Sequence, residues 1–157
     1  PSTATLAIDG TNPSPNVSAP LDTGTVSIDL SGVSSPGSLT IATSITPLSQ
    51  GTPLGITTLS TNYQVSNAGV SFTSAKSCFP YSPADVVAAG VPEASLRLYH
   101  YQGTIWVDVT FGAPDLTNHV ICGNTSSFSP FEIGSKGTFQ VFLPEVVDQS
   151  GPSGAAK

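Results

Sequence analysis

The chain has 157 residues, which is enough for one domain with a sizeable core. Only 9% of its residues are charged, and its formal net charge is −6. This balance excludes the basic surface that nucleic acids and anionic membranes require, so we expect no nucleic-acid partner. No apolar run reaches the roughly 18 residues of a transmembrane helix, so we also expect no membrane span.

The first half of the sequence predicts a series of short strands. Apolar and polar residues alternate in residues 3–8, 24–30 and 39–44, and further strand patterns cover 54–65 and 70–79. Residues 9–16 predict a turn-rich loop that ends in Asn16-Val17-Ser18, an acceptor pattern for N-glycosylation. Strands that recur about every dozen residues, with turns between them, predict a sandwich or a barrel.

Residues 83–89 form the helix-like segment of the sequence. Ser82 has the side chain of an N-cap, and Pro83 suits the first helical position. Asp85 falls in the first turn, and Gly90 follows the last apolar residue. We expect one or two helical turns that bridge the sheets.

A β-hairpin is predicted around Gln102-Gly103, because strict alternation continues on both sides of this pair. Gly at the second turn position accepts the positive φ of a tight turn. An aliphatic face should lie against the core; it consists of Leu96, Leu98, Ile105, Val107 and Val109. Trp106 belongs to the opposite face, so its ring should cover the sheet beside Tyr99 or Tyr101.

The last third of the chain adds strand patterns near residues 120–122, 128–133 and 138–143, with Pro130 marking an edge position or a bulge. Residues 1–143 therefore predict a single all-β domain, an Ig-like antiparallel β-sandwich of about 8–10 strands with one short helical turn. Two terminal segments are candidates for strand exchange between subunits: residues 1–10, and residues 138–143 with the tail that follows them. Residues 144–157 are a tail rich in Gly, Ser and Pro.

The two cysteines, Cys78 and Cys122, are open to two interpretations. We prefer a disulfide across neighbouring strands, as expected in a secreted setting, over two buried free thiols. A disulfide would close a long loop and contribute roughly 4 kcal/mol in the chain-entropy model. Two Cys and two His do not match a zinc-binding spacing, so we expect no zinc site.

Few residues suggest chemistry. His100 shares a face with Leu98, so we expect a core or boundary histidine rather than a ligand or base. His119 lies at a loop-to-strand junction and should be at the surface. Two sets of oxygen ligands offer minor candidates for Ca²⁺, although neither has the dense spacing of a calcium loop. The sets are Asp108, Asp115 and Asn118, and Asp9, Asp22 and Asp29.

Lys76 raises the hypothesis of an intramolecular isopeptide bond. In an extended strand, Lys76 lies on the same face as Phe72 and Cys78. If that face is buried, a lysine of lowered pKa would attack an Asn amide with help from a carboxylate such as Glu132. We prefer an outward-facing lysine on an edge or bulged strand.

Five aromatic residues offer a platform for sugar binding: Tyr63, Tyr81, Tyr99, Tyr101 and Trp106. We prefer a packing role for them, because they are scattered among several strands.

Several spaced segments resemble one family. They are Cys78-Phe-Pro-Tyr-Ser-Pro-Ala-Asp-Val86, Leu96-Arg-Leu-Tyr-His-Tyr101, Trp106-Val-Asp-Val-Thr110, Val120-Ile-Cys-Gly123 and Ser126-Ser-Phe-Ser-Pro-Phe131. Together they resemble a β-sandwich domain of secreted bacterial and archaeal surface proteins, over roughly residues 70–134. The resemblance implies an extracellular setting and a stalk, spacer or surface-display role without catalysis.

A more distant likeness is to the autoproteolytic segment of adhesion-receptor extracellular domains. Asn124 stands where that segment has its basic histidine, and Ser126 stands where it has its nucleophilic threonine. Without a histidine to take the hydroxyl proton, the acyl shift lacks its base, so we predict no self-cleavage. Asn124 also begins a second pattern for N-glycosylation, Asn-Thr-Ser.

We therefore expect an extracellular structural subunit of a microbial surface fibre, sheath or surface layer. It would form a homo-oligomer or polymer through β-strand addition between subunits. The alternatives are an adhesin or carbohydrate-binding module, with a glycan as partner, and an accessory domain of a secreted enzyme. We expect no enzyme activity, because no nucleophile, base or metal constellation emerges from the sequence.

Overall fold

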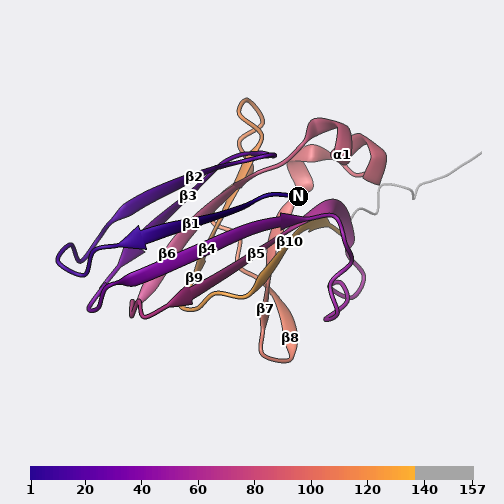
Figure 1. Cartoon of the computed structure of the whole chain (residues 1–157). Coiled ribbons are helices and arrows are strands. Elements are labelled where there is room, and N and C mark those ends of the chain that lie inside the picture. Colours follow the sequence, from indigo (N-terminus) through magenta and orange to yellow (C-terminus); the bar gives the residue numbers. More distant parts are fainter. Residues whose placement is uncertain (137–157) are drawn as a thin grey trace, which may run out of the picture.

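In the computed structural model, which describes residues 1–136, ten strands form two antiparallel sheets that pack together (Figure 1). This arrangement is the all-β sandwich that the sequence predicts. The predicted strand at residues 138–143 and the tail at 144–157 lie outside the described residues. No helix in residues 1–136 is long and apolar enough to cross a membrane.

The six-stranded sheet, sheet A, consists in spatial order of β1 (Thr3–Ile8), β4 (Gly37–Ser44), β5 (Thr57–Ala68), β10 (Pro130–Ser135), β7 (Arg97–Gln102) and β8 (Ile105–Asp108). The four-stranded sheet, sheet B, consists of β2 (Asn16–Leu21), β3 (Gly24–Ser31), β6 (Ser74–Pro80) and β9 (Val120–Thr125). Two short helices, α1 (Pro83–Ala89) and the 3-10 helix η1 (Glu93–Ser95), connect β6 to β7.

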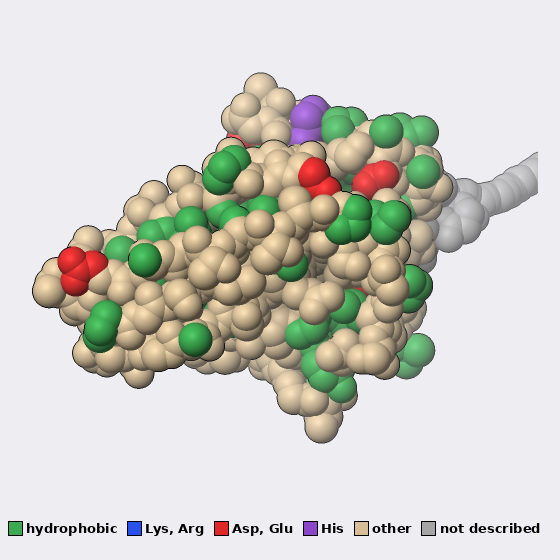
Figure 2. Space-filling view, viewed as in Figure 1, with side chains coloured by type: hydrophobic (Ala, Val, Ile, Leu, Met, Phe, Trp, Pro, Cys, Tyr) green, Lys and Arg blue, Asp and Glu red, His purple; other side chains and the backbone are tan. Residues whose placement is uncertain are grey.

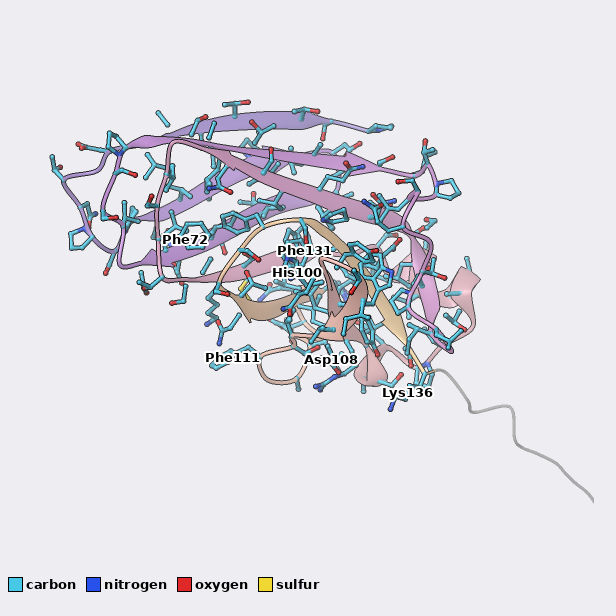
Figure 3. All side chains as sticks on the ribbon, turned by 90° about the horizontal axis from the view of Figure 1, so that it is seen from below. Phe72, His100, Asp108, Phe111, Phe131 and Lys136 are labelled. Atoms are coloured by element: carbon cyan, nitrogen blue, oxygen red, sulfur yellow. A yellow bond between two sulfur atoms is a disulfide. The ribbon has the colours of Figure 1, made fainter. Side chains whose placement is uncertain are left out.

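The core lies between the sheets and contains a chain of aromatic rings. The ring of Phe79 lies 4.6 Å from that of Tyr63 and 4.9 Å from that of Phe131, centroid to centroid. His100 extends this chain, because its ring lies 4.6 Å from Phe131 and is fully buried (Figure 3). Offset and tilted ring pairs of this kind add to the free energy of area burial.

Helix α1 confirms each of its sequence signals. The Ser82 hydroxyl accepts a hydrogen bond from the main-chain N–H of Asp85, and Pro83 begins the helix. Gly90 ends it with a φ of 70°, and its N–H donates to the carbonyls of Val86 and Val87. A residue with a side chain would adopt this left-handed conformation only under strain.

Strand β2 is not predicted by the sequence pattern, which assigns Asn16 to a loop. Pro20 breaks the strand signal, yet it fits here because β2 is an edge strand. Leu30 N–H donates to Pro15 O at 3.0 Å, so Asn16, Ser18 and Pro20 have their main-chain groups directed away from β3. The missing N–H of Pro20 therefore removes no hydrogen bond from the sheet.

The predicted disulfide is confirmed. Cys78 in β6 and Cys122 in β9 are directly opposite each other, and their sulfur atoms are bonded. Phe79 and Ile121, the next residues along each strand, point into the core. The disulfide therefore lies on the outer face of sheet B, where both cysteines are half-buried.

The predicted hairpin is also present, and it projects from the body of the sandwich (Figure 1). Trp106 pairs with Tyr101, and their rings meet edge to face at 5.3 Å. Leu98 is fully buried as expected, but the prediction for Ile105 is wrong, because its side chain is 61% exposed. Ile105 is next to the turn of the hairpin, in the part that projects from the body of the sandwich (Figure 1).

Candidate functional site

A row of four polar side chains crosses the outer face of sheet A. Asn62 in β5 is opposite Glu132 in β10, Glu132 is opposite Tyr99 in β7, and Tyr99 is opposite Asp108 in β8. These four residues are called the polar row below. Phe131 and its alternate neighbours point the other way, into the core, so the strand period places the polar row outside.

The polar row is nevertheless largely closed off from solvent. Asn62, Glu132 and Tyr99 are exposed by only 3%, 3% and 6%, respectively. The loop between β4 and β5, residues 45–56, lies over this part of the sheet, and Asn62 Nδ2 donates to Thr46 O at 3.0 Å. Coverage by a loop that is distant in sequence explains why no sequence pattern reveals Asn62 as a buried residue.

A pocket of about 460 Å³ opens at the Tyr99–Asp108 end of the polar row. Its walls come from the β4–β5 loop, the β7–β8 hairpin and the residue after β10. They are residues 52–54, Ile56, Tyr99, Ile105, Trp106, Asp108 and Lys136.

Figure 2 shows hydrophobic side chains gathered around the base of the projecting hairpin. Leu54 and Ile105 are the most exposed of the apolar residues that line the pocket. Figure 3 places Asp108 and Lys136 on the same side of the molecule.

Two polar atoms of the pocket walls lack a hydrogen-bond partner in the described chain. They are the Tyr99 hydroxyl and the Trp106 indole Nε1, and both are shielded from bulk water. Leaving a buried donor unpaired costs about 1–3 kcal/mol. Asn62 Oδ1, farther along the polar row, is unpaired in the same way. The two unpaired donors of the pocket walls, in Tyr99 and Trp106, are therefore candidates for hydrogen bonds to a bound ligand.

The two carboxyl groups of the polar row differ in their environment. Burial raises the pKa of Glu132 to about 7. The pKa of Asp108 is lowered: although burial opposes this, hydrogen bonds from Arg97 and Thr110 stabilise its charged form. Arg97 Nε donates to Asp108 Oδ2 at 2.8 Å, and the Thr110 hydroxyl donates to Oδ1 at 2.6 Å. Asp108 is therefore a fixed, charged acceptor at the pocket.

The five predicted aromatic residues divide into separate groups. Tyr99, Tyr101 and Trp106 come together on the outer face of the hairpin. Tyr63 lies in the core instead. Tyr81 donates its hydroxyl proton to Glu93 Oε2 at 2.7 Å.

The structure does not bring Lys76 and Glu132 together. Lys76 lies on the outer face of sheet B, between Asp29 and Asn124 in register, and its ammonium group is 4.8 Å from the ring centroid of Phe111. Glu132 lies on the outer face of sheet A. The half-buried position of Lys76 agrees with an outward-facing lysine. The expectation of an edge or bulged strand is wrong, because β6 is an inner strand of sheet B and pairs on both sides without a register shift.

The two sets of calcium candidates do not form clusters. Asp115 accepts hydrogen bonds from Thr117 and Asn118, and Asp108 belongs to the pocket. Asp22 accepts a hydrogen bond from Thr43, whereas Asp29 accepts one from Asn16. Within residues 1–136 no three His, Cys, Asp or Glu side chains come close enough to hold a metal ion.

Both histidines have structural partners. His100 Nε2 is 2.7 Å from the Ser129 hydroxyl, as expected for a core histidine, but its Nδ1 has no partner in the described chain. His119, expected at the surface, is partly covered, and its Nδ1 is 2.7 Å from Glu93 Oε2. Because Tyr81 and His119 bond to the same carboxylate oxygen, Glu93 ties η1 to the chain before β9.

The two acceptor patterns for N-glycosylation occupy the same face. Asn16 in β2 and Asn124 in β9 are both exposed on the outer face of sheet B. Register places them at opposite ends of one row, with Asp29 and Lys76 between them.

No protein-family model matches this chain, and no curated protein matches it either. The resemblance to surface β-sandwich domains thus stays an expectation from the residues.

Proposed function

We propose that this chain is an extracellular structural module, a subunit of a microbial surface fibre, sheath or surface layer that assembles by β-strand addition. The observation that carries the proposal is the edge of β1. This strand ends sheet A among the described residues. Ser2 O accepts a hydrogen bond from Thr43 N at 2.9 Å, so Thr3, Thr5 and Ala7 have their main-chain N–H and C=O directed away from β4.

The edge of β1 also lacks three of the features that usually prevent strand addition, namely charge, proline and a bulge. Native edge strands carry charges, proline or bulges, or they are short or covered. β1 contains no charged residue and no proline, and it pairs with β4 over six residues without a register shift.

The other sheet edges are protected. β2 contains Pro20, and β8 is only four residues long and ends in Asp108. The outer edge of β9 is partly covered by the segment after β8, because Phe111 N–H donates to Cys122 O at 2.8 Å and Asn124 N–H donates to Val109 O at 3.1 Å. Among residues 1–136, β1 therefore presents the edge best suited to accept a strand.

A neighbouring copy of the chain is the proposed donor. Residues 138–143, which lie outside the described residues, predict a strand in which Phe139, Val141 and Leu143 share one face. A strand donated head to tail leaves each subunit with one acceptor and one donor, which produces a polymer. The disulfide and the exposed glycosylation patterns support an extracellular setting.

Substitution of Thr5 by proline tests the proposal. The main-chain N–H of Thr5 points away from β4. Thr5→Pro therefore removes a donor from the open edge without removing a hydrogen bond of sheet A. We expect the parent chain to form regular filaments or sheets by negative-stain electron microscopy and light scattering, and Thr5→Pro to remain monomeric.

Ser18→Pro is the matched control, because Ser18 has the same outward backbone geometry on the edge of β2. All three chains are produced without N-glycosylation, because Ser18 also belongs to the acceptor pattern of Asn16. It should assemble like the parent chain. A parent chain that stays monomeric at high concentration, or equal loss of assembly in both variants, would contradict strand addition at β1.

A further inference from the structure

We propose that the pocket at the end of the polar row binds a neutral sugar residue, a function separate from assembly at β1. The pocket lies beside β8, whereas β1 is at the opposite edge of sheet A. A volume of about 460 Å³ accommodates one or two pyranose rings. The pocket is therefore accessible when the edge of β1 is occupied.

The pocket walls contain groups that complement both surfaces of a sugar. A pyranose ring has an apolar C–H face and a rim of hydroxyl groups. Trp106, Leu54 and Ile105 provide apolar and aromatic surface for the first. Tyr99 and Asp108 provide a hydroxyl group and a carboxylate for the second.

The hydrogen-bonding state of the walls favours a hydroxyl-bearing ligand over an apolar one. The Tyr99 O–H and the Trp106 indole N–H are donors without an acceptor in the described chain. Asp108 accepts three hydrogen bonds, from Arg97, from the Thr110 hydroxyl and from the Thr110 N–H, which leaves one of about four lone-pair positions for a ligand. An apolar ligand would leave all of these groups unpaired, whereas a sugar hydroxyl both donates and accepts.

The charges of the pocket favour a neutral sugar over an acidic one. Among the lining residues, Asp108 carries one negative charge and Lys136 one positive charge, so the charges of the lining sum to zero, and Arg97 does not line the pocket. A lining without net charge suits a neutral ligand and does not concentrate anions.

The test uses the single tryptophan of the chain, since Trp106 lies in the pocket and reports its occupancy directly. The probes are the methyl glycosides of glucose, galactose, mannose and N-acetylglucosamine, with glucuronic acid and cyclohexanol for comparison. We expect at least one neutral glycoside to shift Trp106 fluorescence and to show saturation-transfer NMR signals. Glucuronic acid and cyclohexanol should bind more weakly.

Tyr99→Phe is the decisive variant, because it removes only the unpaired hydroxyl and keeps the ring. We expect it to weaken sugar binding by about threefold to tenfold, the effect of one lost hydrogen bond. A merely structural hydroxyl would instead lower thermal stability, whereas loss of an unpaired buried group should leave stability unchanged or raised. Tyr101→Phe is the control, since Tyr101 packs on Trp106 but does not line the pocket, and it should bind like the parent chain.

Three results would overturn the proposal. One is the absence of fluorescence and saturation-transfer signals with every neutral glycoside. Another is stronger binding of cyclohexanol or glucuronic acid than of any neutral glycoside. The third is equal weakening by Tyr99→Phe and Tyr101→Phe.

Discussion

Two buried titratable residues respond to folding in opposite directions. Burial raises the pKa of Glu132 from 4.5 to about 7 and lowers the pKa of His100 from 6.5 to about 4. Folding therefore favours protonated Glu132, whose contribution to stability is complete below pH 4.5 and is lost as the pH rises through 7. It also favours neutral His100, whose contribution is complete above pH 6.5 and is lost as the pH falls through 4.

Between about pH 5 and 6.5, the stability lost at Glu132 as the pH rises should equal the stability gained at His100. The parent chain should therefore show nearly constant stability in this range. Glu132→Gln removes the pH dependence that Glu132 gives to the free energy of unfolding and leaves the pH dependence that comes from His100. The free energy of unfolding of this variant, measured by urea denaturation, should then rise by about 1–2 kcal/mol from pH 5 to 6.5. The double variant with His100→Gln should be flat again. A Glu132→Gln variant with no pH dependence would show that His100 is not held neutral.

At the scale of elements, the sequence predicts features that depend on neighbouring residues. It does not predict which surfaces are covered by segments distant in the chain. The cap of α1 by Ser82 and Gly90 depends on neighbours in the chain, and the sequence predicts it correctly. Burial of Asn62 depends on the β4–β5 loop, and Ile105 is exposed because the hairpin projects from the body of the sandwich. Alternation predicts which face a residue occupies, but not whether another element covers that face.

The candidate site shows the same division. Tyr99, Trp106 and Asp108 are each noticed in the sequence, and pairing across the predicted hairpin brings them together. Leu54 and Lys136 complete the pocket from segments far from the hairpin in the chain. No spacing in the sequence marks these two residues, because only the packing of the loop against sheet A places them there.

The disulfide between β6 and β9 gives a prediction at the element scale. It spans a sequence separation of 44 residues, so the chain-entropy model gives a contribution of about 4 kcal/mol. Because the bond lies on an outer face and is half-buried, a soluble reductant can reach it. We expect dithiothreitol to lower the melting temperature, measured by circular dichroism. A Cys78→Ser/Cys122→Ser variant should melt like the reduced chain and not respond to the reductant.

At the scale of the whole molecule, the scarcity of charge predicts how assembly responds to salt. The chain has only four Lys or Arg and ten Asp or Glu residues, and β1 has none. The proposed strand addition at β1 would depend on main-chain hydrogen bonds and apolar contacts, which salt does not screen. Light scattering should therefore show a similar critical concentration at low and high sodium chloride. A steep fall in assembly with salt would indicate a contact driven by charge.

If the chain is part of a surface fibre, as proposed, the position of the disulfide has a mechanical consequence. Tension applied outside the two cysteines passes from Cys78 to Cys122 through the sulfur atoms, so residues 79–121 carry no force. This shielded segment contains α1 and the β7–β8 hairpin with its side of the pocket. At about 3.5 Å per residue it would otherwise add roughly 150 Å of extension. While sheet B is pulled apart, the disulfide prevents residues 79–121 from extending, so the hairpin is not stretched.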